Sequence, residues 1–154
     1  MAVPGPTFSL TITDVCKALG GLNRSRVHAC TKLPPFSFIE TSERSARRFD
    51  MTDVLTLAAL QKLEDVYGVK SRQLGQLSAG IHHYLGEPKP AGYDELIFVR
   101  LKDGLARSLD AEPINEPGWV LDVAEERGRI NVFLGIAPPQ RQLPLMVSVS
   151  GRAS

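Results

Sequence analysis

A segment rich in proline and glycine divides the sequence into two parts with different patterns. Residues 86–92 contain two prolines and two glycines, and a helix cannot continue through them, because proline lacks an amide N–H and clashes with the preceding turn. Before this segment apolar residues recur at helical spacing, whereas after it they form short runs typical of β-strands. We therefore predict an α+β protein, with one unit over residues 1–86, a linker over 87–92 and a small antiparallel β-rich unit over 93–154.

The amino acid composition is that of a globular chain. Hydrophobic residues make up 43% and charged residues 23% of the sequence, and both fractions are ordinary for a folded domain. No apolar run reaches the ~18–20 residues of a membrane-spanning helix, no secretory signal is visible at Met1, and two cysteines are too few for a disulfide framework. These features predict a soluble cytoplasmic protein with no membrane partner.

Positive charge is concentrated in one short stretch of the chain. Residues 17–48 contain seven lysines and arginines against two acids, although the whole chain has a net formal charge of only +1. A basic patch confined to one region is the pattern that a phosphate-binding surface leaves in a sequence. The same charges could also belong to an ordinary solvated face, so charge alone does not decide between the two.

Two short helices are predicted within and just before this basic stretch. Thr11 begins the first through a capping box with Asp14, and Gly20–Gly21 ends it. Asn23 is a good N-cap for the second helix, which we expect to run to Leu33, where two prolines follow. Two short helices joined by a tight glycine-containing turn are a helix-turn-helix candidate.

The predicted second helix has a polar outer side. Val27, Cys30 and Leu33 form its inward stripe. Its outer side and flank carry the polar and basic residues of the segment: Arg24, Ser25, Arg26, His28, Thr31 and Lys32.

A hairpin and two longer helices are predicted next. Residues 36–39 and 46–49 have the pattern of two strands around a polar turn. Asp50 or Thr52 would cap a third helix that ends at Gly68, and Ser71 would cap a fourth. The fourth helix has an apolar stripe that could pack on its own unit or on a second copy of the chain: Leu74, Leu77, Ile81 and Leu85.

The order of these parts resembles the MerR-type winged helix. The first helix, Leu10-Thr11-Ile12-Thr13-Asp14-Val15 with Gly20 after it, is similar to the family pattern Leu-Thr-Ile-x-x-Val-x-x-x-x-Gly. The segment 47–57, Arg-Arg-Phe-Asp-Met-Thr-Asp-Val-Leu-Thr-Leu, is similar to the family's passage from wing to helix. The resemblance covers roughly residues 8–85 and implies a winged-helix fold that binds double-stranded DNA.

The sequence departs from the family at three places. His28–Ala29 stands where members usually have an aromatic pair, and the predicted wing lacks the usual glycine. The long dimerising helix of typical members is replaced by a short helix and the β-type segment. Metal or drug sensing, which that family places beyond its DNA-binding domain, is therefore not expected here, and we predict no cofactor.

The resemblance assigns roles to the residues of the second helix. A recognition helix reads base edges in the major groove, and its amino-terminal residues reach deepest. Arg24 and Arg26 are thus the candidates for base contacts, with Ser25 beside them and with His28 and Lys32 farther along.

Three arginines of the predicted hairpin are candidates for phosphate contacts. Arg44, Arg47 and Arg48 would lie along the DNA backbone, or one of them would enter the minor groove. The alternative for Arg48 is a purely structural ion pair with Asp50 or Asp53.

The carboxyl-terminal part is predicted to be a small sheet. Residues 96–101 and 105–109 flank Asp103–Gly104, a strong hairpin signal. Residues 119–123 and 130–134 are predicted to form a second hairpin, and 145–149 a fifth strand. So small a sheet is more secure when it packs on a partner, so we predict that it makes a homodimer, with the stripe of the fourth helix as the second candidate interface.

The sequence offers few residues arranged for metal binding or catalysis. Cys16, His28 and Cys30 are residue types that bind zinc, but their spacing fits no finger or ribbon and the cysteines fall on inward faces. His82–His83 lies late in the fourth helix, where capping or solvent exposure is the simpler interpretation. With no nucleophile and base at a usable spacing, we predict no metal site and no enzyme.

The sequence therefore predicts a dimeric, nucleoid-associated transcriptional regulator that binds specific double-stranded DNA. The alternative is a protein-interaction module, an adaptor or antitoxin-like partner, that keeps the winged-helix shape without binding DNA. The two differ in their response to salt, because DNA binding weakens steeply as salt rises and protein binding does so only slightly.

Overall fold

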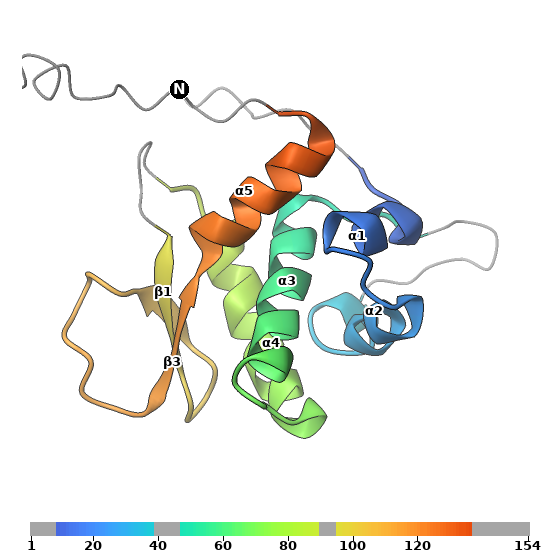
Figure 1. The fold of residues 1–154 in the computed structure, drawn as a ribbon. Helices are drawn as coiled ribbons and strands as arrows, with labels where there is room; N and C mark the ends of the chain where they lie inside the picture. The colour runs from blue at the N-terminus through green and yellow to red at the C-terminus, as the bar shows by residue number, and fades with distance from the viewer. Residues whose placement is uncertain (1–8, 39–46, 90–94, 137–154) are drawn as a thin grey trace, which may run out of the picture.

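The computed structural model describes residues 9–38, 47–89 and 95–136, and the structural statements below concern these residues. They form a mixed α+β fold, as predicted, in which five α-helices and one 3-10 helix accompany a three-stranded antiparallel sheet (Figure 1). The elements in chain order are α1 Ile12–Ala18, α2 Arg24–Thr31, the 3-10 helix η1 Phe36–Phe38, α3 Met51–Asp65, α4 Ser71–Gly86, β1 Leu96–Arg100, β2 Ala106–Ser108, β3 Gly118–Asp122 and α5 Val123–Leu134. None of the described helices is long and apolar enough to cross a membrane.

The amino-terminal helices begin at the predicted caps. The Thr11 hydroxyl accepts a hydrogen bond from the Asp14 amide, and the Asp14 carboxylate accepts one from the Thr11 amide at 3.1 Å, which completes the capping box of α1. Asn23 caps α2 by accepting from the Ser25 amide at 2.8 Å. Asp50 is the cap of α3, through a second capping box with Asp53. Helix α2 ends at Thr31, two residues before the predicted end.

Helix α4 buries its apolar stripe inside its own chain. Leu74, Leu77, Ile81 and Leu85 are all buried in the core. The helix begins at Ser71 itself, so that Lys70 is the N-cap and makes no side-chain cap hydrogen bond. The prediction that Ser71 is the cap is therefore wrong by one residue. The stripe is not available as a dimer interface, because α3 and the sheet already cover it.

The first arm of the predicted hairpin is not a strand. Phe36–Phe38 forms a turn of 3-10 helix, held by the Phe38 amide bonding to the Pro35 carbonyl at 3.0 Å. Phe49, in the predicted return arm, pairs with Leu10 across a single antiparallel bridge. Phe36 is buried with its ring edge-on to His82, and its carbonyl oxygen accepts from the Arg47 side chain at 2.8 Å instead of from a neighbouring strand. The rest of the predicted hairpin, 39–46, lies outside the described residues.

The sheet has the strand order β2-β1-β3, with both pairs antiparallel. The predicted turn at Asp103–Gly104 joins β1 to β2, and Gly104 has the positive φ of 74° that favours glycine there. A side chain at Gly104 or at Gly80 of α4 would collide with the other element's backbone. The two glycines thus let α4 approach the sheet closely.

The predicted second hairpin is wrong, because residues 123–134 form helix α5 instead of a turn and a strand. Asp122 caps this helix by accepting from the Glu125 amide at 3.3 Å, and two glutamates in the first turn suit the positive end of the helix dipole. Val123 and Ile130, seven residues apart, are buried on one side of the helix. The predicted strand at 145–149 lies outside the described residues.

One hydrophobic core runs through both parts of the described chain. It includes Val15 and Leu57 from the amino-terminal helices as well as Ile97, Leu121 and Ile130 from the sheet and α5. Helix α5 lies across α1 and α3 (Figure 1). The core therefore holds the amino-terminal helices and the sheet in a fixed relation.

Candidate nucleic-acid interface

Helix α2 lies on the outside of the fold, with α1 and α3 behind it (Figure 1). The turn that leads into it contains Gly20 and Gly21, with φ values of 77° and 83°, which residues with a side chain adopt only with strain. Val27 is fully buried in the core below α2. The opposite side of α2 is left open to solvent.

The open side of α2 carries four of the predicted site residues. Arg24, His28 and the C-cap residue Lys32, which keeps helical backbone angles, are exposed and four residues apart. Each therefore lies only about 40° around the helix from the one before it. Ser25 is exposed beside them, and its hydroxyl is bonded to Asn23 at 2.6 Å. The eight residues of α2 include no acid. We call these four side chains the outer face of α2.

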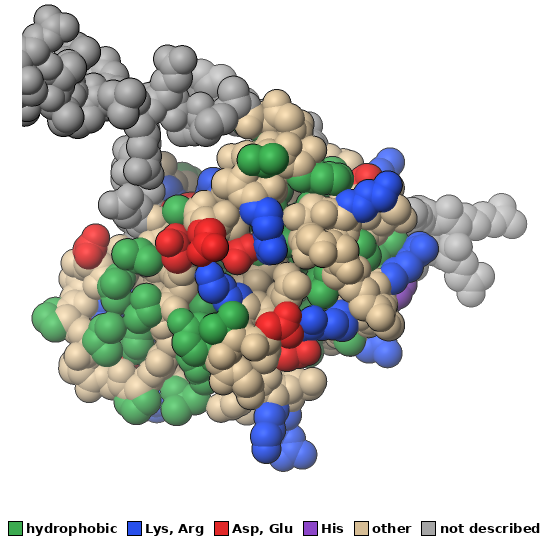
Figure 2. All heavy atoms as spheres, viewed as in Figure 1, with side chains coloured by type: hydrophobic (Ala, Val, Ile, Leu, Met, Phe, Trp, Pro, Cys, Tyr) green, Lys and Arg blue, Asp and Glu red, His purple; other side chains and the backbone are tan. Residues whose placement is uncertain are grey.

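The outer face belongs to a larger basic side of the molecule. Lys and Arg side chains gather along the side on which α1 and α2 lie (Figure 2). Lys17 at the end of α1 and Arg48 are exposed as well. The Thr11 backbone, whose amide donates to Asp14, lowers the pKa of that carboxyl, and Lys17 and Arg48 lower it further.

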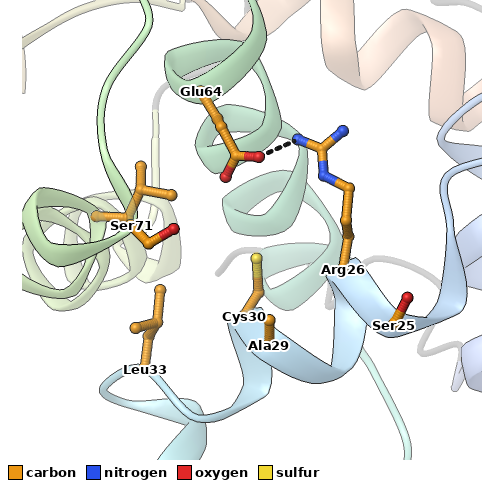
Figure 3. A pocket seen from close by; sticks show the side chains of 8 residues that line it. Ser25, Arg26, Ala29, Cys30, Leu33, Glu64 and Ser71 are labelled. Atoms are coloured by element: carbon orange, nitrogen blue, oxygen red, sulfur yellow. Dashed lines mark ion pairs between the residues drawn. The ribbon is translucent and has the colours of Figure 1, made fainter.

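Arg26 lies on a different side of α2. It is about 160° around the helix from Arg24, and its guanidinium bonds both oxygens of Asp65, at 2.9 and 3.3 Å, at the end of α3. A third contact, at 3.0 Å, joins it to Glu64 (Figure 3). The bond to Asp65 raises the pKa of Arg26. The structure therefore places this predicted base-reading residue in an ion-pair cluster that holds α2 against α3.

The three predicted phosphate-binding arginines have different positions. Arg47 is half-buried and donates to the carbonyl oxygen of Phe36 at 2.8 Å, which holds η1 in place. Arg48 is exposed, and no hydrogen bond or ion pair joins it to Asp50 or Asp53, all three being described residues. Arg44 lies outside the described residues.

Asp53 has a partner that the sequence did not reveal. Its carboxylate lies 2.8 Å from Nε2 of His82. His82 is half-buried, whereas the sequence favoured helix capping or solvent exposure for it. His83 is exposed and pairs with Glu87 at 3.1 Å. The Asp53–His82 pair joins the start of α3 to α4 beneath η1. It therefore supports η1, the segment that follows α2.

A hollow of about 270 Å³ lies behind α2, between the end of α3 and the start of α4 (Figure 3). Leu33 and Leu74 form part of its wall, and the Cys30 side chain points into it. Burial raises the pKa of the Cys30 thiol to about 11, so the thiol is protonated at neutral pH. Within the described ranges, no group of three or more His, Cys, Asp or Glu side chains is placed to hold a metal ion.

Comparisons of the chain with protein-family models, with curated proteins and with solved structures found no match.

Proposed function

We propose that the protein binds specific sequences of double-stranded DNA, with α2 in the major groove. The observation that carries this proposal is the outer face of α2, where Arg24, His28 and Lys32 line one exposed side of a helix without acids. A helix of this kind fits the major groove, where the donor and acceptor pattern of each base pair is distinct. The absence of acids in α2 keeps the local field favourable to phosphates.

The proposal assigns a different role to each of the basic residues. Arg24 is the first residue of α2 and is the base-reading candidate, because the amino-terminal end of a recognition helix reaches deepest. Lys32 and Arg48 are exposed and contribute phosphate contacts, which give affinity without preference. Arg26 is a positioning residue, because Glu64 and Asp65 hold its guanidinium.

A regulator of transcription is the proposed role, and the resemblance to the MerR-type winged helix over roughly residues 8–85 supports it. The residues that carry that resemblance lie in α1, in α2 and at the capped start of α3. Two copies of α2 in a dimer would read two half-sites, which raises both affinity and selectivity.

The experiment is a selection of bound duplexes from a random DNA pool, followed by titration of the selected duplex over a range of salt concentrations. The proposal predicts enrichment of a defined sequence and an affinity that falls steeply with salt, since each phosphate contact releases counterions. Lys32→Ala should flatten the slope by about one unit, whereas Lys102→Ala should not, because Lys102 is an exposed lysine of the β1–β2 turn.

The same experiment can contradict the proposal. A pool that yields no enriched sequence, together with an affinity for duplex DNA that does not vary with salt, would leave the protein-interaction module as the better account of the fold.

A further inference from the structure

An exposed apolar surface lies at one edge of the sheet, along β3. In the order β2-β1-β3, the strand β3 is at one edge of the sheet, whereas the other edge strand, β2, contacts α4. Val120 of β3 is 36% exposed, and Val66 and Tyr67, which follow α3, are 65% and 46% exposed. Tyr67 is next to Val120, because its hydroxyl donates to the Val120 carbonyl oxygen at 2.9 Å. Apolar side chains also gather over the sheet in Figure 2.

The hydrogen-bonding groups of β3 show which of its residues face away from the sheet. The Leu101 amide bonds to the Pro117 carbonyl, and the Val123 amide bonds to the Glu95 carbonyl. In an antiparallel pair every second residue bonds to the neighbouring strand. Gly118, Val120 and Asp122 therefore direct their backbone groups outward. Among the described residues, the Val120 amide N–H has no partner.

The edge lacks three of the features that commonly prevent strand pairing. Its residues, Gly118–Asp122, include no lysine, no proline and no bulge, which are the common means of protecting an edge. The Tyr67 hydroxyl uses only one of the two lone pairs of the Val120 oxygen. A second strand can therefore still pair there.

We propose that β3 pairs with β3 of a second copy of the chain, antiparallel and centred on Val120, so that two three-stranded sheets become one of six strands. A two-fold interface requires that the same surface complement itself. In this register Val120 faces Val120 of the other copy, and Asp122 faces Gly118, which has no side chain. No like charges are directly opposed, and apolar side chains meet along the centre of the interface.

The register also brings a second layer of contacts together. The two-fold axis is perpendicular to the sheet, so both copies have α3 on the same side of it. Val66 and Tyr67 of each copy then lie beside those of the other and cover apolar surface that is exposed in the single chain. This interface is distinct from the apolar stripe of α4, which the fold buries. It would form whether or not the protein binds DNA, so the two proposals can fail separately.

The test is sedimentation of the full chain without DNA over a range of protein concentrations. The proposal predicts a monomer–dimer equilibrium that Val120→Lys weakens at least tenfold, because the charge would lie at the centre of the interface. Val132→Lys is the matched control, since Val132 is 78% exposed on α5 and is not part of β3. A wild-type chain that stays monomeric, a Val120→Lys chain that dimerises as the wild type does, or an equal loss in both variants would each overturn the proposal.

Hydrogen exchange of the wild-type chain gives a second measurement that does not depend on a variant that folds. The Val120 amide should become protected as the protein concentration rises, while the Trp119 and Leu121 amides, which face β1, should be protected at all concentrations. Exchange at Val120 that does not change with concentration would also overturn the proposed pairing.

Discussion

The outer face of α2 and the edge of β3 are both open surfaces, but they differ in almost every property. The first offers long basic side chains, including Arg24 and Lys32, to a partner of opposite charge. The second offers backbone groups and apolar side chains around Val120. Charged surfaces of the first kind suit a polyanion, and apolar edges of the second kind suit a protein strand. Under the two proposals, DNA and a second copy of the chain would therefore bind at separate surfaces.

The end of α3 connects the two surfaces. Glu64 and Asp65 bond to Arg26 of α2, and two residues later Tyr67 bonds to β3. The end of α3 and the turn that follows it therefore contact both α2 and β3. Binding at the two surfaces should weaken together when a mutation destabilises the shared core. It should weaken at one surface alone when a mutation changes only the side chains of that surface.

The largest expected effect comes from the shared core. Ile130 of α5 is fully buried, and Ile130→Ala should lower the free energy of unfolding by about 2–5 kcal/mol, through lost transfer energy and the cavity left behind. Because one hydrophobic core lies beneath both surfaces, chemical denaturation of the variant should still give one transition. Val132→Ala, at an exposed position on the same helix, is the control and should change little. Two separate transitions would show that the surfaces belong to independent units.

The next effect concerns the cap of α1, the helix that packs behind α2. Thr11→Ala should cost about 1 kcal/mol of stability, as the loss of an N-cap usually does, and Thr13→Ala, at an exposed position in α1, should cost much less. Urea denaturation at neutral pH measures both. Equal costs would contradict the assigned role of Thr11.

The same cap predicts a dependence on pH. The pKa of Asp14 is lowered from its ordinary value of 3.8 in the folded chain, mainly by the Thr11 backbone hydrogen bond. Its contribution is therefore present above that ordinary value and is lost as the pH falls through the folded pKa. Asp14→Asn should destabilise the protein at neutral pH, and the difference from wild type should shrink in acid. A difference that does not change with pH would contradict this assignment.

A smaller effect is expected at the ion pairs behind α2. Both partners are partly exposed, so a double-mutant cycle of Arg26→Ala and Asp65→Ala should give a coupling energy of about 0–1 kcal/mol. Asp110→Ala is a suitable control for the loss of one exposed carboxylate, since Asp110 lies in the turn after β2. A coupling energy of several kcal/mol would mean that the cluster is more buried than the structure shows.

The smallest expected effect concerns the rate at which the Cys30 thiol is alkylated. Burial raises the pKa of its thiol to about 11, and thiolates are the reactive form. Alkylation of Cys30 at neutral pH should be much slower than that of a short peptide containing cysteine, and it should accelerate only in strong alkali. Rapid labelling of the folded chain at neutral pH would show that the hollow behind α2 is more open than the structure indicates.

The helices that begin with strong caps were predictable from the sequence. Thr11, Asn23 and Asp50 each act through atoms within three residues of themselves, so local sequence contains the information. The turn at Asp103–Gly104 was predictable for the same reason. The outer face of α2 followed from helical spacing once its start was known.

The features that were missed depend on contacts between distant parts of the chain. Asp65, which bonds to Arg26, lies 39 residues away in the sequence, and Phe36 of η1 packs against His82 of α4. Residues 130–134 form a short apolar run of the kind found in strands, but they belong to helix α5, which buries Val123 and Ile130 on one side. A periodicity over five residues cannot distinguish those outcomes.

The central claim is that the outer face of α2 reads DNA sequence while Arg26 only holds the helix in place. The most direct measurement compares the affinity of Arg24→Ala and Arg26→Ala for the selected duplex and for its single-base variants. The account predicts that Arg24→Ala loses about 1–3 kcal/mol on the selected site and relaxes the preference at one or two positions, whereas Arg26→Ala weakens binding and keeps the preference of the wild type. A folded Arg24→Ala chain with full affinity and unchanged preference would contradict it.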